Sequence, residues 1–270
     1  MKINLPIIIT TTVLLGTVSF ASFAQSGADE KRYSTCMDLA VRAPDKAINQ
    51  ALVWQGEQGG IPARHCEALG LFYLKEYMES AARLEHIAED MRVGKDMPVR
   101  MGKRMVATAS MLADMYGQAA NAWLMADEIV RAESAIDAAL SLTVNGSIQE
   151  SELLVDRARI AAADEDFDAA LKDLEKAQLL DPGRKDILVL IAASARGTGS
   201  FLKASQALDE YQRLFPNRTD GHLERGNLYD AQGMTSAARI SWLKVLSYGE
   251  VGSDADAARA NLERIDLVKE

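Results

Sequence analysis

The two cysteines, Cys36 and Cys66, are the residues whose spacing says most about chemistry. A metal site of Cys36, His65 and Cys66 would lack a fourth close ligand and the short cysteine spacing of structural zinc sites. A redox-active pair would lie close together, as in Cys-X-X-Cys, whereas these cysteines are about 30 positions apart. In an exported chain an even cysteine count favours a structural disulfide, which would stabilise the fold by roughly 3 to 4 kcal/mol.

The three histidines, His65, His86 and His222, have no serine or cysteine at a spacing that indicates a nucleophile elbow or a triad. Catalytic partners can converge from distant positions, so an enzyme acting on envelope material is an alternative. We expect a protein that is not an enzyme, with no cofactor, no metal site and no catalytic residues.

Methionine is concentrated in one part of the chain, which holds seven of the eleven: Met91, Met97, Met101, Met105, Met111, Met115 and Met125. Thioethers can bind Cu(I), but methionines one helical turn apart also suit adaptable packing. The pairs Met101/Met105 and Met111/Met115 have that spacing on an expected helix, and we favour packing.

The same region carries a basic cluster against the single acid Asp96: Arg92, Lys95, Arg100, Lys103 and Arg104. A run of charge is usually a solvated helix face. In a chain this acidic, the cluster could instead dock an anionic partner such as phosphate, a lipid headgroup or an acidic protein face.

Residues 1–24 have the features of a secretory signal peptide. Lys2 supplies the positive start, Ile7 to Phe20 the apolar stretch, and Ser22-Phe23-Ala24 a small-X-small cleavage site. We expect cleavage after Ala24 and export to a bacterial periplasm, with no membrane span in the mature chain. An uncleaved membrane anchor is the competing interpretation. The formal charge is −9, and loss of Lys2 makes it −10, which disfavours binding to nucleic acid.

The composition indicates an all-α protein. The chain has 270 residues, 48% of them hydrophobic and only 6% aromatic. Abundant alanine suits closely packed helices, and the mature part has no convincing alternating run of β-branched residues.

A pattern with a step of about 34 residues recurs three times between Ser151 and Gly252. Each copy holds two amphipathic segments, in the first copy Glu152 to Ala163 and Asp168 to Leu180. A lone helix pair cannot bury its apolar face, so neighbouring pairs must stack. The equivalent positions are Ala158/Ala192/Gly226, Ala170/Ala204/Ala238, Leu174/Leu208/Trp242, Phe167/Phe201 and Pro182/Pro216.

These columns resemble the tetratricopeptide repeat (TPR): a small residue in the first helix, an aromatic before the second, alanine early in it, and proline after it. In the third copy Glu250 stands where proline is expected. The resemblance implies a right-handed α-solenoid of helix pairs. We expect residues 25–95 to be a helical segment with a divergent repeat, and residues 96–150 to be an irregular helix pair. Three repeats follow (151–184, 185–218 and 219–252), and residues 253–270 hold a capping helix.

Outside the repeats we expect helices at Tyr33–Val41, Pro44–Trp54, Pro62–Leu74 and Met78–Met91, after a disordered lead-in from Ser26 to Arg32. Arg92 to Val99 should be a break, and the chain from Val99 to Leu142 should again be helical. A capping helix at Asp254–Val268 should cover the open end of the array with Ala257, Ala260, Leu262 and Ile265.

In the family that this chain resembles, the first helix of each pair lines a concave groove. The resemblance therefore implies a peptide-binding groove of Val155, Arg159, Val189, Arg196, Leu223, Asn227 and Asp230. A peptide or a helix of another protein would lie in it, with Arg159 and Arg196 fixing its direction. Some members of the family bind a C-terminal carboxylate with lysines and asparagines from adjacent repeats. In this chain Asn227 is nearly the only such residue, which disfavours that specialised activity. We expect a scaffold or adaptor. One alternative function is a structural module that associates with copies of itself. For the groove, the alternative is that these residues are solvated and bind no ligand.

Overall fold

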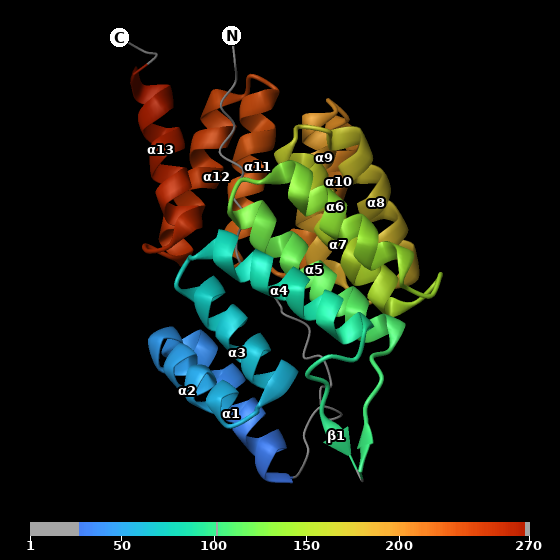
Figure 1. The fold of residues 1–270 in the computed structure, drawn as a ribbon. Coiled ribbons are helices and arrows are strands. Elements are labelled where there is room, and N and C mark those ends of the chain that lie inside the picture. Colours follow the sequence, from blue (N-terminus) through green and yellow to red (C-terminus); the bar gives the residue numbers. More distant parts are fainter. Residues whose placement is uncertain (1–26, 101, 268–270) are drawn as a thin grey trace. The chain divides into compact units, whose positions relative to one another are not determined.

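The computed structural model describes residues 27–100 and 102–267 (Figure 1). The predicted signal peptide, residues 1–24, lies outside them, so its cleavage and the export of the chain stay predictions. The described residues form two compact units, 27–160 and 161–267, and the division falls within helix α7. No helix among the described residues is both long and apolar enough to cross a bilayer.

Residues 27–160 are helical except for one short hairpin, and helices adjacent in the chain pack on one another from α1 to α6. The hairpin projects from the α4–α5 connection (Figure 1). The elements are α1 (Gly27–Arg42), α2 (Pro44–Gly56), α3 (Gly60–Tyr73), α4 (Tyr77–Arg92), β1 (Val99–Arg100), β2 (Lys103–Arg104), α5 (Ala109–Met125), α6 (Ile129–Ser141) and α7 (Ile148–Ala163), the last ending beyond the unit.

Residues 161–267 contain helix pairs at the predicted spacing, and their first helices also contact each other, α9 with α11 and α11 with α13. Trp242 lies at the centre of a core shared by α11, α12 and α13. The elements are α8 (Phe167–Leu180), a 3₁₀ turn (Lys185–Ile187), α9 (Leu188–Gly197), α10 (Phe201–Leu214), α11 (Thr219–Ala231), α12 (Thr235–Tyr248) and α13 (Ser253–Leu267).

Local chemistry explains where these helices begin and end. The side chain of Asp166 accepts a hydrogen bond from the backbone of Ala169 at 3.0 Å and caps α8. The first helix of each pair ends in a left-handed residue at one repeat position, Glu165 (φ 63°), Gly199 (φ 76°) and Gly233 (φ 75°). The chain therefore reverses the same way in each copy.

The helix predicted from Val99 onward is wrong up to Thr108, because this stretch forms the hairpin. Val99 pairs with Arg104, and Arg100 with Lys103, around Gly102 in the left-handed region (φ 73°). The backbone N–H of Met105 donates to the carbonyl of Pro98 at 2.8 Å and closes the hairpin base. Met105 lies on no helix, so the Met101/Met105 pairing on a helix is wrong, whereas Met111 and Met115 both lie on α5.

Two further expectations need correction. The stretch Ser26–Arg32 is not a disordered lead-in over its described part, because α1 begins at Gly27. In α13 the predicted Leu262 and Ile265 are buried in the core and Ala257 packs against it, together with Ala255 and Ala258, whereas Ala260 is exposed. Only Ala260 was wrong, because several alanines on this helix fit either face.

Candidate interaction surfaces

The predicted disulfide is confirmed. Cys36 of α1 and Cys66 of α3 are bonded, with 6.0 Å between their Cα atoms. Both are buried among Ala40, Ala47 and Leu69. The bond ties the first helix to the third in a unit whose core is rich in alanine.

His65, next to the bridge, joins three helices through its two ring nitrogens. Nδ1 lies 2.6 Å from the Tyr33 hydroxyl on α1, and Nε2 lies 2.7 Å from the side-chain oxygen of Gln118 on α5. Because an amide oxygen only accepts, Nε2 carries the proton and Tyr33 donates to Nδ1. Burial lowers the pKa of His65 to about 4, against a smaller raising effect of the Gln118 bond. His65 is thus a neutral cross-brace. No three His, Cys, Asp or Glu side chains of the described residues converge as a metal site would require.

In residues 161–267 the first helices α9, α11 and α13 form one surface, which we call the first-helix wall. Arg196 of α9 donates to Glu224 of α11 through Nε at 2.6 Å and Nη2 at 3.3 Å. Asn227 donates to Glu224 at 3.3 Å and accepts from Trp242 Nε1 and from Asn261 of α13, each at 3.2 Å. One hydrogen-bonded row therefore crosses three helices.

The corresponding helices of residues 27–160 are also joined by side chains. Gln149 of α7 donates to Asp114 of α5 at 2.7 Å, and Asn121 of α5 donates to Asp156 of α7 at 3.0 Å. Burial, together with the nearby charge of Glu152, raises the pKa of Asp114 to about 6. The Gln149 bond opposes that shift only in part.

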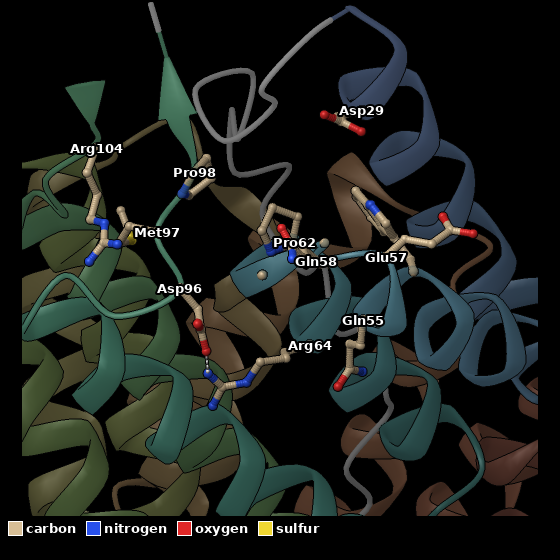
Figure 2. Close-up of a pocket in the computed structure, with 13 residues that line it drawn as sticks. Asp29, Gln55, Glu57, Gln58, Pro62, Arg64, Asp96, Met97, Pro98 and Arg104 are labelled. Atoms are coloured by element: carbon tan, nitrogen blue, oxygen red, sulfur yellow. Dashed lines mark hydrogen bonds and ion pairs between the residues drawn. The ribbon is translucent and has the colours of Figure 1, made fainter. Parts of the chain in front are cut away.

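A pocket of about 500 Å³ lies between the α2–α3 turn and the segment that leads into the hairpin (Figure 2). We call it the hairpin pocket. The buried side chains of Trp54, Pro62 and Met97 line it. Figure 2 shows Arg104 and Met97 on one side and Glu57 on the other. Its residues come from positions far apart in the chain, so no local motif marks it.

The predicted basic cluster divides into engaged and available cations. Arg92 donates to the Tyr116 hydroxyl at 3.1 Å, and Lys95 pairs with Asp90 at 3.1 Å. Arg104 donates to the carbonyl of Gly94 at 3.3 Å and meets no carboxylate among the described residues. The cluster lies on a helix end and a hairpin, not on one helix face.

Solved structures share this arrangement of helices. A tetratricopeptide repeat protein from Parabacteroides merdae superposes with a TM-score of 0.60 at 12% identity, covering 90% of this chain and 89% of that one. Pseudomonas aeruginosa PilF superposes with a TM-score of 0.58 at 11% identity, covering 86% of this chain and 99% of that one. The Cut9–Hcn1 hetero-tetramer of APC/C gives 0.61 at 15% identity over 90% of this chain and 48% of that chain, so this protein spans about half its length.

The fold is a tetratricopeptide repeat array. No protein-family model matches the sequence, and no curated protein matches it significantly. The identities to the solved TPR structures are low, so the likeness concerns the fold alone.

The seven residues predicted for the TPR groove divide between the two units. Four are half-buried on the first-helix wall of residues 161–267: Val189, Arg196, Asn227 and Asp230. Leu223 packs in the core around Trp242. In the other unit Val155 is fully buried, and Arg159 pairs with Asp156 at 2.7 Å. Whether these residues bind a peptide stays a prediction.

Sequence analysis missed the partners of these TPR residues, although the repeat step could have revealed two of them. Asn261 lies 34 positions after Asn227, and Arg264 lies 34 positions after Asp230, with which it forms an ion pair. Residues one repeat apart occupy equivalent places on neighbouring first helices, so polar pairs at that step are candidates for contact. Glu224, 28 positions after Arg196, has no such signal.

Proposed function

We propose that this protein is a non-catalytic scaffold of the bacterial periplasm or cell envelope, which binds a peptide or helix of another protein along its first-helix wall. The observation that supports this most is the hydrogen-bonded row from Arg196 through Glu224 and Asn227 to Asn261. It holds polar groups in fixed positions on three adjacent helices before any partner arrives. Binding to such a surface costs little side-chain entropy.

The ion pair between Arg196 and Glu224 favours a partner that carries no charge at this part of the wall. Arg196 and Glu224 are 12% and 8% exposed at their side chains and neutralise each other, so Arg196 is not a free cation for a partner's carboxylate. The wall offers amide groups at Asn227 and Asn261 and an aliphatic side chain at Val189. An extended backbone with small or apolar side chains suits these groups best.

Export to the periplasm is supported by the character of residues 1–24 and by the disulfide. Disulfides persist in oxidising compartments and are rare in reducing ones. The bridge between Cys36 and Cys66 is buried, as a structural bridge would be.

The test blocks the wall without breaking its ion pair. Ala193 is half-buried on α9, four residues after Val189 and three before Arg196, hence on the same helical face. Chemical cross-linking in intact source cells should capture a partner with the wild type and lose it with Ala193→Arg. Leu202→Arg, at a 75% exposed site on α10, is the matched control and should retain capture.

Both variants should first show unchanged circular dichroism and thermal midpoint. Equal capture by Ala193→Arg and wild type would place the binding surface elsewhere. Capture of the protein's own chain alone, with light scattering that reports oligomers, would favour the self-associating module.

A further inference from the structure

We propose that the hairpin pocket is a second binding site, which takes an acidic peptide segment of another protein. Arg104, which lines the pocket, would hold its carboxylate, and an adjacent apolar side chain would enter the pocket. Lys103, on the other face of β2, would add to the attraction from a greater distance. This site belongs to residues 27–160, whereas the first-helix wall belongs to residues 161–267, so the proposal does not rest on the function proposed above.

Of the three carboxylates that line the hairpin pocket, two are ion-paired and the third lies away from Arg104. Glu57 is paired with Arg32 at 2.6 Å, and Asp96 is paired at 3.2 Å with Arg64, which Asp90 also contacts. Asp29 lies on the α1 side, opposite Arg104 (Figure 2). Arg104, in contrast, meets only a carbonyl oxygen among the described residues.

Lys103, its neighbour on β2, is exposed and forms no ion pair within the described part of the chain. In a protein of formal charge −9, these two cations lie in a stretch, residues 97–113, that contains no acidic residue. An acidic segment would be repelled by most of the surface and attracted here.

The interior of the hairpin pocket determines the second half of the ligand. Trp54 and Met97 are each 4% exposed, and Pro62 is buried beside them. A volume of about 500 Å³ lies within the usual range of ligand sites. A free phosphate would leave these apolar groups unused, and a flat bilayer surface would not reach them. A peptide can supply a carboxylate and an apolar side chain together.

The walls of the hairpin pocket are held in place by bonds that need no ligand. The N–H of Ile61 donates to the carbonyl of Asp96 at 3.1 Å and fastens the segment before the hairpin to α3. Gly60 (φ 55°) makes this approach possible, because a Cβ there would lie 2.4 Å from that oxygen. The Arg32 guanidinium lies 5.0 Å from the centre of the Trp54 ring and supports it. A preformed pocket costs little to order on binding.

The experiment selects a display library of random peptides on the immobilised protein and compares wild type with Lys103→Glu plus Arg104→Glu. The wild type should enrich peptides in which Asp or Glu adjoins an aromatic or aliphatic residue. The double variant should lose that enrichment and bind a selected peptide at least about tenfold more weakly by fluorescence anisotropy. Arg104→Gln, which removes one charge without repulsion, should give a smaller loss.

Lys172→Glu plus Lys244→Glu is the matched control, because it changes two exposed lysines elsewhere by the same total charge. It should bind the selected peptide as the wild type does, and so should Ala193→Arg. Hydrogen exchange on the complex should show protection in residues 54–62 and 96–104. The proposal is overturned if wild type and the hairpin variant enrich the same peptides, or if no acidic–apolar class is enriched. Sedimentation with phosphatidylglycerol vesicles, without peptide selectivity, would overturn it in favour of a membrane surface.

Discussion

Gly226 of α11 lies against the indole of Trp242 of α12, so closely that a Cβ on Gly226 would be 2.3 Å from the ring nitrogen Nε1. The same nitrogen donates to Asn227, the next residue on α11. One glycine therefore allows two helices to approach and places the amide of Asn227 on the first-helix wall. The repeat pattern that fixes the fold also orders the proposed binding surface.

Gly226→Ala should lower the free energy of unfolding by about 1 to 2 kcal/mol, because overpacking against Trp242 outweighs the better helix propensity of alanine. Urea denaturation measures it. Gly56→Ala is the control, since a Cβ at Gly56 meets nothing within 4 Å. It should leave stability unchanged or raise it by up to about 1 kcal/mol. Equal stability of both variants would show that the indole can move aside at no cost.

Glu165→Gly should stabilise the protein by about 1 kcal/mol, because a left-handed backbone is unfavourable for a residue with a Cβ. Glu165 has φ 63°, and the equivalent positions of the next two repeats are Gly199 and Gly233. The thermal midpoint should rise. The reciprocal change, Gly199→Glu, should lower it by a similar amount, and a rise in both would contradict the explanation.

Replacing Cys36 and Cys66 together by alanine should cost about 3 to 4 kcal/mol, because the bridge restricts a loop of 30 residues in the unfolded chain. Urea denaturation of the oxidised protein with and without a thiol reductant should give a matching difference. The reductant should leave the double variant unaffected. A loss much smaller than this would mean that the reduced unfolded chain keeps residual structure.

His65 should make stability depend on pH between about 4 and 6.5. Its pKa is about 4 in the folded protein and near 6.5 when unfolded, so the unfolded chain binds more protons in this window. Stability should therefore fall as pH falls from 6.5 towards 4, by up to about 3 kcal/mol. His65→Gln should flatten this part of the profile, as chemical denaturation at a series of pH values can show.

Asp114 acts in the opposite direction and provides the comparison. Its folded pKa, raised to about 6, means that ionisation weakens the fold as pH rises through 3.8 to 6. Asp114→Asn should add about 1 kcal/mol at pH 7, a value reduced for its partial exposure, and nothing below pH 4. For the histidine prediction, a stability profile between pH 4 and 6.5 that is unchanged in His65→Gln would mean that other groups cause the pH dependence.

Breaking the Arg196–Glu224 pair should be costly from either side. Arg196→Met or Glu224→Gln alone should destabilise by about 3 kcal/mol, because each leaves one nearly buried charge without its partner. The double variant should lose less than the sum of the two, and a double-mutant cycle measures the coupling. Additive losses would mean that the two side chains do not depend on each other.

The helices of the repeats were predictable because their signals are local. Pro182 and the alanine columns placed the end of α8 at Leu180, as observed. The hairpin was not predictable from periodicity, since Met101 and Met105 have helical spacing while Pro98 and Gly102 decide the backbone. The surfaces proposed here for binding could be predicted less well. The groove assignment rested on family geometry and could not show that Arg196 is neutralised by Glu224. The hairpin pocket joins Trp54 to Met97, residues that no sequence pattern connects.

Because of where the disulfide lies, the two units should differ in how strongly their stability depends on oxidation of the thiols. The loop it closes lies entirely within residues 27–160, and residues 161–267 contain no part of it. A chain whose thiols remain reduced would lose this restraint in the first unit alone. Limited proteolysis should therefore cut within residues 27–160 earlier in the reduced protein than in the oxidised one.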